Sequence, residues 1–229
     1  AGRAEELARL HQHLTSAAVP HAMTLLGRRR SGRSAFIASA RRKFDESFVW
    51  ATPDAGAITD ESSWLRALYQ CSKDAASARG LSVHRLPRWP DEKNHAEQRV
   101  WLQDTGLPEL YQLIRPHRRL IWIMDGVEPL AEAVARGALP EDLGAWMSGL
   151  LGPQLGAIVT AHVDNESMLG RLAPFTDTIA TIRLGALNED EIAELLEFGR
   201  GDPDETMAKQ LLAATGGLPE LALKAAAAI

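Results

Sequence analysis

The chain has 229 residues and a formal net charge of −5, with 45% hydrophobic and 24% charged residues. This is the composition of an ordinary globular protein, and it excludes a chain disordered throughout. The acidic balance also excludes a strong overall attraction to nucleic acid or to an anionic membrane. The single cysteine, Cys71, excludes an internal disulfide and a cysteine-based zinc site, which favours a cytoplasmic protein. No run approaches the roughly 18 apolar residues of a membrane span.

The first half of the chain alternates between apolar runs and segments with helical spacing. Leucines three and four residues apart predict a helix over 5–14, and the apolar run 22–26 predicts a buried strand that stops at Gly27. The elements that follow, after a loop to Ser34, are a helix over 35–44, a strand over 47–51 and a helix over 62–76. The segment 80–95 holds two prolines and few periodic apolar residues, so we expect a loop there.

The second half continues the alternation and then becomes helical only. We expect a helix over 96–117, interrupted near Gly106 and Pro108, and then the clearest strand of the chain over 119–124. The later strands are predicted at 156–160 and 178–184, with a helix over 143–151 before them. The last elements are predicted as helices over 189–198, 204–214 and 219–229. The chain starts with Ala and ends in a helical alanine run, so we expect a piece of a larger protein.

The order of these elements predicts an α/β fold. Continuous apolar strands that alternate with helices are typical of a parallel sheet covered on both faces, with right-handed crossovers. The pattern therefore predicts a three-layer fold with a five-stranded parallel sheet over residues 1–187. The helical remainder, 188–229, is predicted to be a small helical subdomain.

The segment Gly27 to Ser34 has the sequence Gly-Arg-Arg-Arg-Ser-Gly-Arg-Ser, between a predicted strand and a predicted helix. Glycines in this place let successive backbone N–H groups point at phosphate oxygens, and the helix N-terminus adds partial positive charge. Arg33 stands where lysine is usual; its planar guanidinium can pair with phosphate but differs in shape. The candidate phosphate-binding residues are Gly27, Ser31, Gly32, Arg33, Ser34 and Ala35. The alternative is a basic turn that binds no ligand.

Polar residues also follow two of the predicted strands. Asp125 comes directly after the strand 119–124, where it would hold Mg²⁺ together with the Ser34 hydroxyl, and Glu128 is the candidate for orienting a water. Thr160 ends the next strand and is the candidate sensor of a terminal phosphate. The alternative for Asp125 is that it only caps the strand or starts a turn. For Thr160 the alternative is an ordinary residue at a strand end, and for His162 it is a solvated surface residue.

Together these segments resemble the STAND class of signal-transduction ATPases, relatives of the AAA+ proteins that include NB-ARC and NACHT domains. The segments that carry the resemblance are Gly2-Arg3-Ala4-Glu5-Glu6-Leu7, the phosphate loop, Asp125-Gly126-Val127-Glu128, Thr160-Ala161-His162, Leu184 to Glu191 and Gly217-Leu218-Pro219-Glu220-Leu221. They occur in the family's order over nearly the whole chain. The resemblance implies a three-layer P-loop NTPase fold followed by a helical lid, with a nucleotide bound between them.

The resemblance also implies roles for single residues and a mode of action. Pro219 would lie against the nucleotide, and ATP or ADP with Mg²⁺ would be the cofactor. ADP would close the protein, while ATP would permit it to form a homo-oligomer. Arg33 and His162 depart from the family's lysine and arginine, and both departures weaken hydrolysis more than binding. The Gly-Leu-Pro segment has the alternative reading of a plain helix start.

Three functions follow from this sequence. The first is a nucleotide-binding switch domain of a larger signalling, regulatory or defence protein, with weak or absent hydrolysis, so that ATPase activity itself is left open. The second is a degenerate scaffold with the ATPase fold that binds no nucleotide and serves oligomerisation or docking to protein partners. The third is a DNA-associated AAA+ regulator, which the arginines near the phosphate loop favour slightly and the net acidity disfavours.

Overall fold

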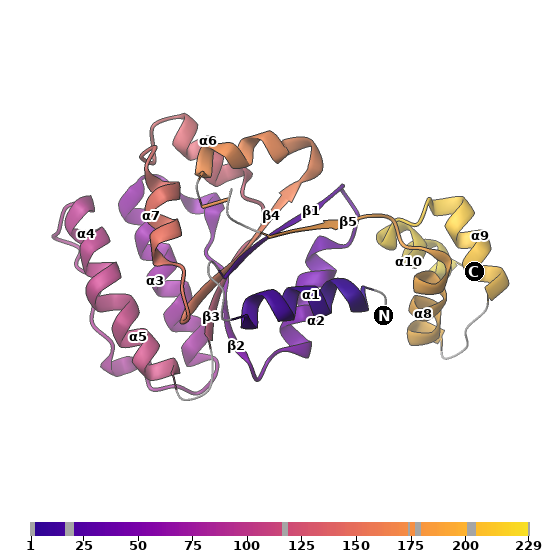
Figure 1. Cartoon of the computed structure of the whole chain (residues 1–229), viewed down its shortest axis with the longest axis horizontal. Coiled ribbons are helices and arrows are strands. Elements are labelled where there is room, and N and C mark those ends of the chain that lie inside the picture. The colour runs from indigo at the N-terminus through magenta and orange to yellow at the C-terminus, as the bar shows by residue number, and fades with distance from the viewer. Residues whose placement is uncertain are drawn as a thin grey trace.

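Five parallel strands form the centre of the molecule, as the alternation of strands and helices predicted (Figure 1). The computed structural model describes residues 3–16, 21–115, 119–173, 175–176, 180–200 and 205–228. The strands are β1 (Ala22–Gly27), β2 (Phe48–Ala51), β3 (Arg119–Met124), β4 (Leu155–His162) and β5 (Ala180–Leu184). Their order in the sheet is β2-β3-β4-β1-β5, so β4 separates β1 from β3. The start of the strand predicted over 178–184 lies outside the described residues.

Helices cover both faces of this sheet, which makes three layers (Figure 1). Side chains alternate along each strand, so that Ile121 and Ile123 of β3 face one side while Leu120, Trp122 and Met124 face the other. The first side packs against α1 (Ala4–Thr15) and α2 (Arg33–Lys43). The second side packs against helices that include α3 (Glu61–Ser77), α5 (Leu107–Ile114), α6 (Glu128–Ala135) and α7 (Leu143–Leu150). The three-layer α/β fold is thereby confirmed.

The α-helix is interrupted near Gly106, as predicted, but by a π turn that keeps the chain helical. α4 (His95–Trp101) continues into α5 through one wide π turn, η3 (Leu102–Gly106). Pro108 has no N–H and its ring would clash inside a regular helix, and the wide turn absorbs this mismatch. A Cβ at Gly106 would lie 2.8 Å from the Trp101 ring, so the turn packs tightly against that indole.

Two elements beside the predicted site, α6 and the 3-10 helix η4, were not expected from the sequence. α6 has only eight residues, and it starts at Glu128, directly after the turn that follows β3. The 3-10 helix η4 (Val163–Leu172) follows β4 and packs against α6 and α7. Both lie beside the carboxyl end of the sheet and therefore shape the edge at which the predicted site residues lie.

The C-terminal helices have a small core of their own. α8 (Glu189–Arg200), α9 (Glu205–Thr215) and α10 (Pro219–Ala228) pack around a shared apolar cluster, whose buried members are Leu187, Ile192, Leu196, Ala208, Leu211 and Ala226. Asn188 and Glu191 cap α8 reciprocally through two bonds of 2.9 Å. Ile229, at the end of the last predicted helix, and Asp204, at the start of the one before it, lie outside the described residues. Within the described ranges, no helix is long and apolar enough to cross a membrane.

Arg3 and Leu187 connect these helices to the rest of the chain. The Arg3 guanidinium donates to the Gly185 carbonyl, and the Arg3 N–H donates to Glu191 at 3.2 Å. The Leu187 N–H donates to the Gly217 carbonyl at 2.7 Å, which holds the segment after β5 against the turn before α10. These contacts bring the start of the chain and the start of α10 to one side of the sheet.

Candidate functional site

The predicted site residues gather at the carboxyl edge of the sheet. Gly27 at the end of β1 is in register with His162 on one side and Leu184 on the other. In open parallel sheets, ligands bind outside the carboxyl ends of the strands, where the strand order reverses. β1 lies between β4 and β5, so the loop that leaves it emerges at such a position.

The loop between β1 and α2 has the backbone that its glycines predict. Gly32 has φ +83° and precedes α2, while Arg30 has φ +67°, which is uncommon for a residue with a side chain. A Cβ at Gly27 would lie 2.2 Å from the Ser31 Oγ, so the loop folds closely over the end of β1. No side chain caps α2 among the described residues, so its first-turn N–H groups remain available to an anion.

Two polar atoms in this loop are buried without a protein partner in the described part of the chain: Ser31 Oγ and Arg33 Nη1. An unpaired buried polar group costs about 1–3 kcal/mol, and a bound anion would offset that cost for these two atoms. Phosphate oxygens would accept from both groups. The cradle therefore fits the phosphates of a nucleotide, whereas Ser34 and Ala35 lie exposed on the first turn of α2.

Asp125 lies exposed at the end of β3, and Thr160 of the neighbouring β4 holds it. The Thr160 side chain is fully buried, and its hydroxyl donates to the Asp125 carboxylate at 2.8 Å while accepting from the Gly126 N–H at 2.8 Å. In this arrangement the Thr160 hydroxyl positions Asp125. The role of Thr160 as a phosphate sensor stays a prediction.

The donor set at this edge suits Mg²⁺ only with help from a ligand. The Ser34 hydroxyl and the Asp125 carboxylate offer the oxygen atoms that Mg²⁺ prefers. No group of three or more His, Cys, Asp or Glu side chains in the described residues could hold a metal by itself. Mg²⁺ commonly completes its shell with phosphate oxygens and waters, so these two residues fit a metal that arrives with a nucleotide.

Thr160→Val is expected to lower the free energy of unfolding by about 1–3 kcal/mol, because it leaves the Gly126 N–H without its acceptor. The matched control is Thr24→Val in β1, since the Thr24 hydroxyl is buried without a partner among the described residues. Removing that hydroxyl should leave stability unchanged or slightly raised. Urea unfolding of the two variants measures both, and equal losses would contradict the structural role of the Thr160 hydroxyl.

Glu128, at the start of α6, faces the end of β4. Its Oε1 accepts from the His162 N–H at 2.9 Å and from the Asn165 side chain at 3.3 Å. Burial acts to raise the pKa of Glu128, but these bonds and the positive charge of Arg33 outweigh it, so the pKa lies below its ordinary value. Glu128 is therefore a fixed carboxylate at neutral pH, and a weak base.

Pro219, at the start of α10, lies over the phosphate loop. A Cβ at Gly32 would be 3.4 Å from the Pro219 ring, and Glu220 lies 3.8 Å from the Arg30 guanidinium. A cavity of about 90 Å³ opens between the loop, α1, α2 and α10. Its lining residues are Arg3, Leu7, Ser31, Gly32, Ala35, Phe36, Ser39, Leu187, Pro219 and Leu223. The cavity thus joins a polar phosphate loop to mostly apolar walls.

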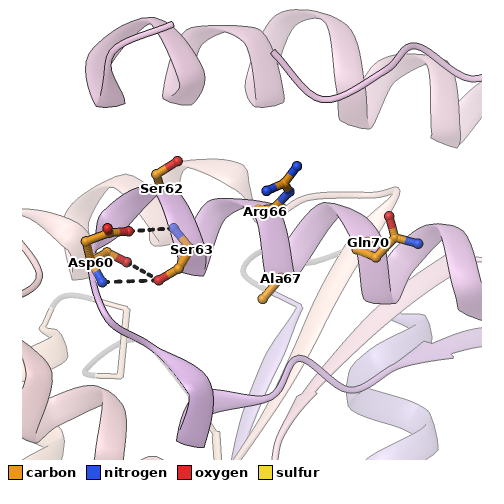
Figure 2. A pocket seen from close by; sticks show the side chains of 6 residues that line it. All are labelled: Asp60, Ser62, Ser63, Arg66, Ala67 and Gln70. Carbon is orange, nitrogen blue, oxygen red and sulfur yellow. Dashed lines mark hydrogen bonds between the residues drawn. The ribbon is translucent and has the colours of Figure 1, made fainter. Parts of the chain in front are cut away.

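A larger hollow of about 450 Å³ lies along the start of α3 (Figure 2). Several of its polar groups already have partners: the Asp60 carboxylate accepts from the Ser63 N–H, and the Ser63 hydroxyl accepts from the Asp60 N–H. Arg66 pairs with Asp91 at 2.6 Å. The hollow contains none of the predicted site residues and no buried unpaired group, so we do not assign it a ligand.

Several residues at the site were not identified from sequence. Asn165 and the apolar wall residue Leu223 carry no sequence signal of their own. Arg41 of α2 donates to the Thr52 hydroxyl after β2; burial lowers its pKa, and the charge of Asp125 partly offsets this. Arg41 lies near the end of α2, and the sequence gives no reason to place it at the site. Its position becomes clear only from the sheet, in which β2 and β3 are neighbours and end side by side.

Comparison with solved structures identifies the fold. A Walker-type ATPase of Pyrococcus abyssi matches 96% of this chain and 65% of its own, with 17% identity and a TM-score of 0.65. A STAND protein with a tetratricopeptide repeat sensor from Pyrococcus horikoshii matches 96% of this chain and 28% of its own, with 14% identity and a TM-score of 0.57. The ORC1 protein of Aeropyrum pernix, solved in complex with DNA, matches 97% and 57%, with 16% identity and a TM-score of 0.56.

At these identities the likeness establishes the fold. The chain has the P-loop ATPase fold found in STAND and AAA+ proteins, as the sequence resemblance predicted. It spans less than two thirds of the length of each of these three chains. No protein-family model matches the chain, and no curated protein sequence matches it.

Proposed function

We propose that this chain binds ATP or ADP between its phosphate loop and its C-terminal helices, and acts as a nucleotide-dependent switch in a larger protein. The observation that carries the proposal is the pair of buried, unpaired polar atoms, Ser31 Oγ and Arg33 Nη1, in a glycine-bounded loop. The loop opens α2, whose first-turn N–H groups have no capping side chain among the described residues. The ATPase fold of the structural neighbours supports the same ligand class.

The proposed roles divide along the edge of the sheet. Arg33, with the backbone at Gly27, Ser31, Gly32 and Ala35, binds phosphates. Ser34 and Asp125 hold Mg²⁺, with Thr160 setting the orientation of the Asp125 carboxylate. Pro219 packs against the adenosine at the mouth of the apolar cavity.

Hydrolysis is proposed to be weak or absent. Mg²⁺ would neutralise charge on the phosphates, and a general base would then have to activate or orient water. A base works best when its pKa lies near the working pH, and the hydrogen bonds and the Arg33 charge keep the pKa of Glu128 below the ordinary carboxylate value. Arg33 adds a second obstacle, because a forked guanidinium does not reproduce the point charge of lysine.

The switch is proposed to act through the junction with the helical part. Residues 1–187 would form the nucleotide-binding domain, and residues 188–229 would form a helical lid over its nucleotide site. The position of Pro219 beside Gly32 supports this, because it places the start of α10 against the phosphate loop. The bond from Leu187 to Gly217 supports it too, because it holds the turn before α10 against the segment after β5. In the full-length protein, a cytoplasmic homo-oligomer is the proposed assembly. The ORC1 neighbour was solved with DNA, but the net charge of −5 disfavours duplex binding, and DNA binding is not proposed.

The test is a titration of the purified chain with fluorescent analogues of ATP and ADP, each with and without Mg²⁺. We expect micromolar binding of both nucleotides, strengthened by Mg²⁺ for the ATP analogue, and turnover that is slow or undetectable. A binding signal that unlabelled ATP cannot displace would come from the fluorophore. No binding at millimolar nucleotide would refute the proposal and leave a scaffold with the ATPase fold.

A further inference from the structure

His162 lies at the end of β4 and touches both the phosphate loop and Glu128. Its Nε2 is 2.8 Å from the Arg29 backbone nitrogen, which donates to it. Its own backbone N–H donates to Glu128 at 2.9 Å. The imidazole is about three quarters buried, with 23% of its side chain exposed. One residue thus bridges the loop after β1 and the first residue of α6.

The hydrogen bonds fix the tautomer of this imidazole. Nε2 accepts from a backbone N–H, so in the neutral ring the proton sits on Nδ1. Nδ1 has two groups of Asp164 within reach, the carboxylate at 3.2 Å and the backbone N–H at 3.3 Å. A neutral ring can accept through only one nitrogen, and the bond from Arg29 to Nε2 is the shorter, at 2.8 Å. The Nδ1 proton is therefore donated to the Asp164 carboxylate, which orients the ring. Both ring nitrogens are therefore committed to protein groups, which leaves neither free to read a phosphate.

The loop conformation next to this bond is a costly one. Arg30, the residue after Arg29, has φ +67°, a conformation that side-chain-bearing residues seldom adopt unless their surroundings impose it. The Ser31 N–H returns to the Arg28 carbonyl at 3.1 Å, which closes a tight turn over Arg29 and Arg30. The bond from Arg29 to His162 anchors one side of that turn to β4.

We propose that His162 is a positioning residue that holds the phosphate loop by the Arg29 amide and ties it to Glu128. His162 stands where the resemblance would place an arginine. At this position β4 therefore contacts the phosphate loop through an imidazole. The expected consequence is that a preformed loop binds nucleotide more tightly, and only this consequence rests on the proposed function. The contact itself is a property of the nucleotide-free chain.

Two substitutions separate the ring positions. In His162→Gln the side-chain carbonyl reaches about as far as Nε2, and in His162→Asn it reaches only about as far as Nδ1. Exchange of the Arg29 amide, followed by NMR in the nucleotide-free chain, should be about 3- to 10-fold faster in His162→Asn and close to wild type in His162→Gln. The control is His84→Asn, at an exposed histidine away from the site, which should leave the Arg29 amide unchanged.

A measurement on the wild-type chain makes the test independent of how the variants fold. The ¹⁵N spectrum of the His162 ring should show a protonated Nδ1 and an unprotonated Nε2, with a coupling across the hydrogen bond to the Arg29 nitrogen. A proton on Nε2, or equal Arg29 exchange in both variants and wild type, would overturn the proposal.

The consequence for binding is read from the ADP affinity of the same variants. His162→Asn should bind ADP several-fold more weakly than wild type, and His162→Gln should recover most of that loss. If wild type binds no ADP, the proposed function fails while the NMR result still decides the contact. If ADP binds and the two variants lose affinity equally, His162 does not position the loop for nucleotide.

Discussion

Arg33→Ala is expected to weaken ATP and ADP binding by about 10- to 100-fold, because a hydrogen bond between charged partners contributes roughly 1.5–3 kcal/mol. The Arg33 side chain folds over Gly27, and its Nη1 is buried without a partner in the described part of the chain. Its charge is therefore held at the loop, where phosphates would bind. Calorimetric titration of wild type and variant with each nucleotide measures the loss.

The matched control for this loss is Arg42→Ala. Arg42 is an exposed arginine in the last turn of the same helix, and its removal changes the net charge by the same amount. Nucleotide affinity should stay within about twofold of wild type, since exposed and distant charges are largely screened by salt. Equal losses in both variants would show that general charge, and not the place of Arg33, governs binding. Arg33→Lys then tests whether the usual side chain restores turnover.

Gly217→Ala is expected to lower the free energy of unfolding of the C-terminal helices by about 3 kcal/mol or more. Gly217 has φ +71°, and a Cβ there would lie 2.3 Å from the Leu187 carbonyl oxygen. The left-handed conformation alone costs about 1–2 kcal/mol with a side chain, and the clash also displaces Leu187 from its bond to Gly217. Nucleotide affinity should fall with it, because Pro219 is carried by the same turn.

The neighbouring glycine isolates the effect of the clash. Gly216 has φ +60°, but a Cβ there would meet no atom within 4 Å. Gly216→Ala should therefore show only the conformational cost, about 1–2 kcal/mol. Thermal unfolding and ADP titration of both variants give the comparison. An equal effect of the two substitutions would contradict the tight junction between Leu187 and Gly217.

The fold was largely predictable because it depends on local patterns. Apolar runs marked all five strands, and the segment from Gly27 to Ser34 stood between a strand and a helix, as the structure confirms. The strand order was not predictable from these runs. α6 was not predicted because Pro129 stands in its first turn and two of its four buried side chains are alanines, so its apolar pattern is weak. The interruption near Gly106 was predicted, but its form was not, because a π turn can absorb a proline that would otherwise end a helix.

The contacts within the candidate site were harder to predict than its location. The sequence pattern predicted Asp125 and Thr160 at strand ends and Glu128 near Asp125, but nothing in it indicated that the Thr160 hydroxyl would donate to Asp125. His162 and Arg29 are 133 residues apart and meet because β4 pairs directly with β1. Contacts of this kind follow from sheet order and register, which a single sequence does not specify.

The most direct test of a nucleotide site between the loop and the C-terminal helices is amide hydrogen exchange of the whole chain with and without saturating ATP and Mg²⁺. A nucleotide bound there should slow exchange in two separate segments, 27–35 around the phosphate loop and 215–223 around the start of α10. Exchange along the hollow at α3, over 60–70, should be unchanged. Protection confined to α3, or no change in either of the two segments at saturating nucleotide, would contradict a nucleotide site at this place.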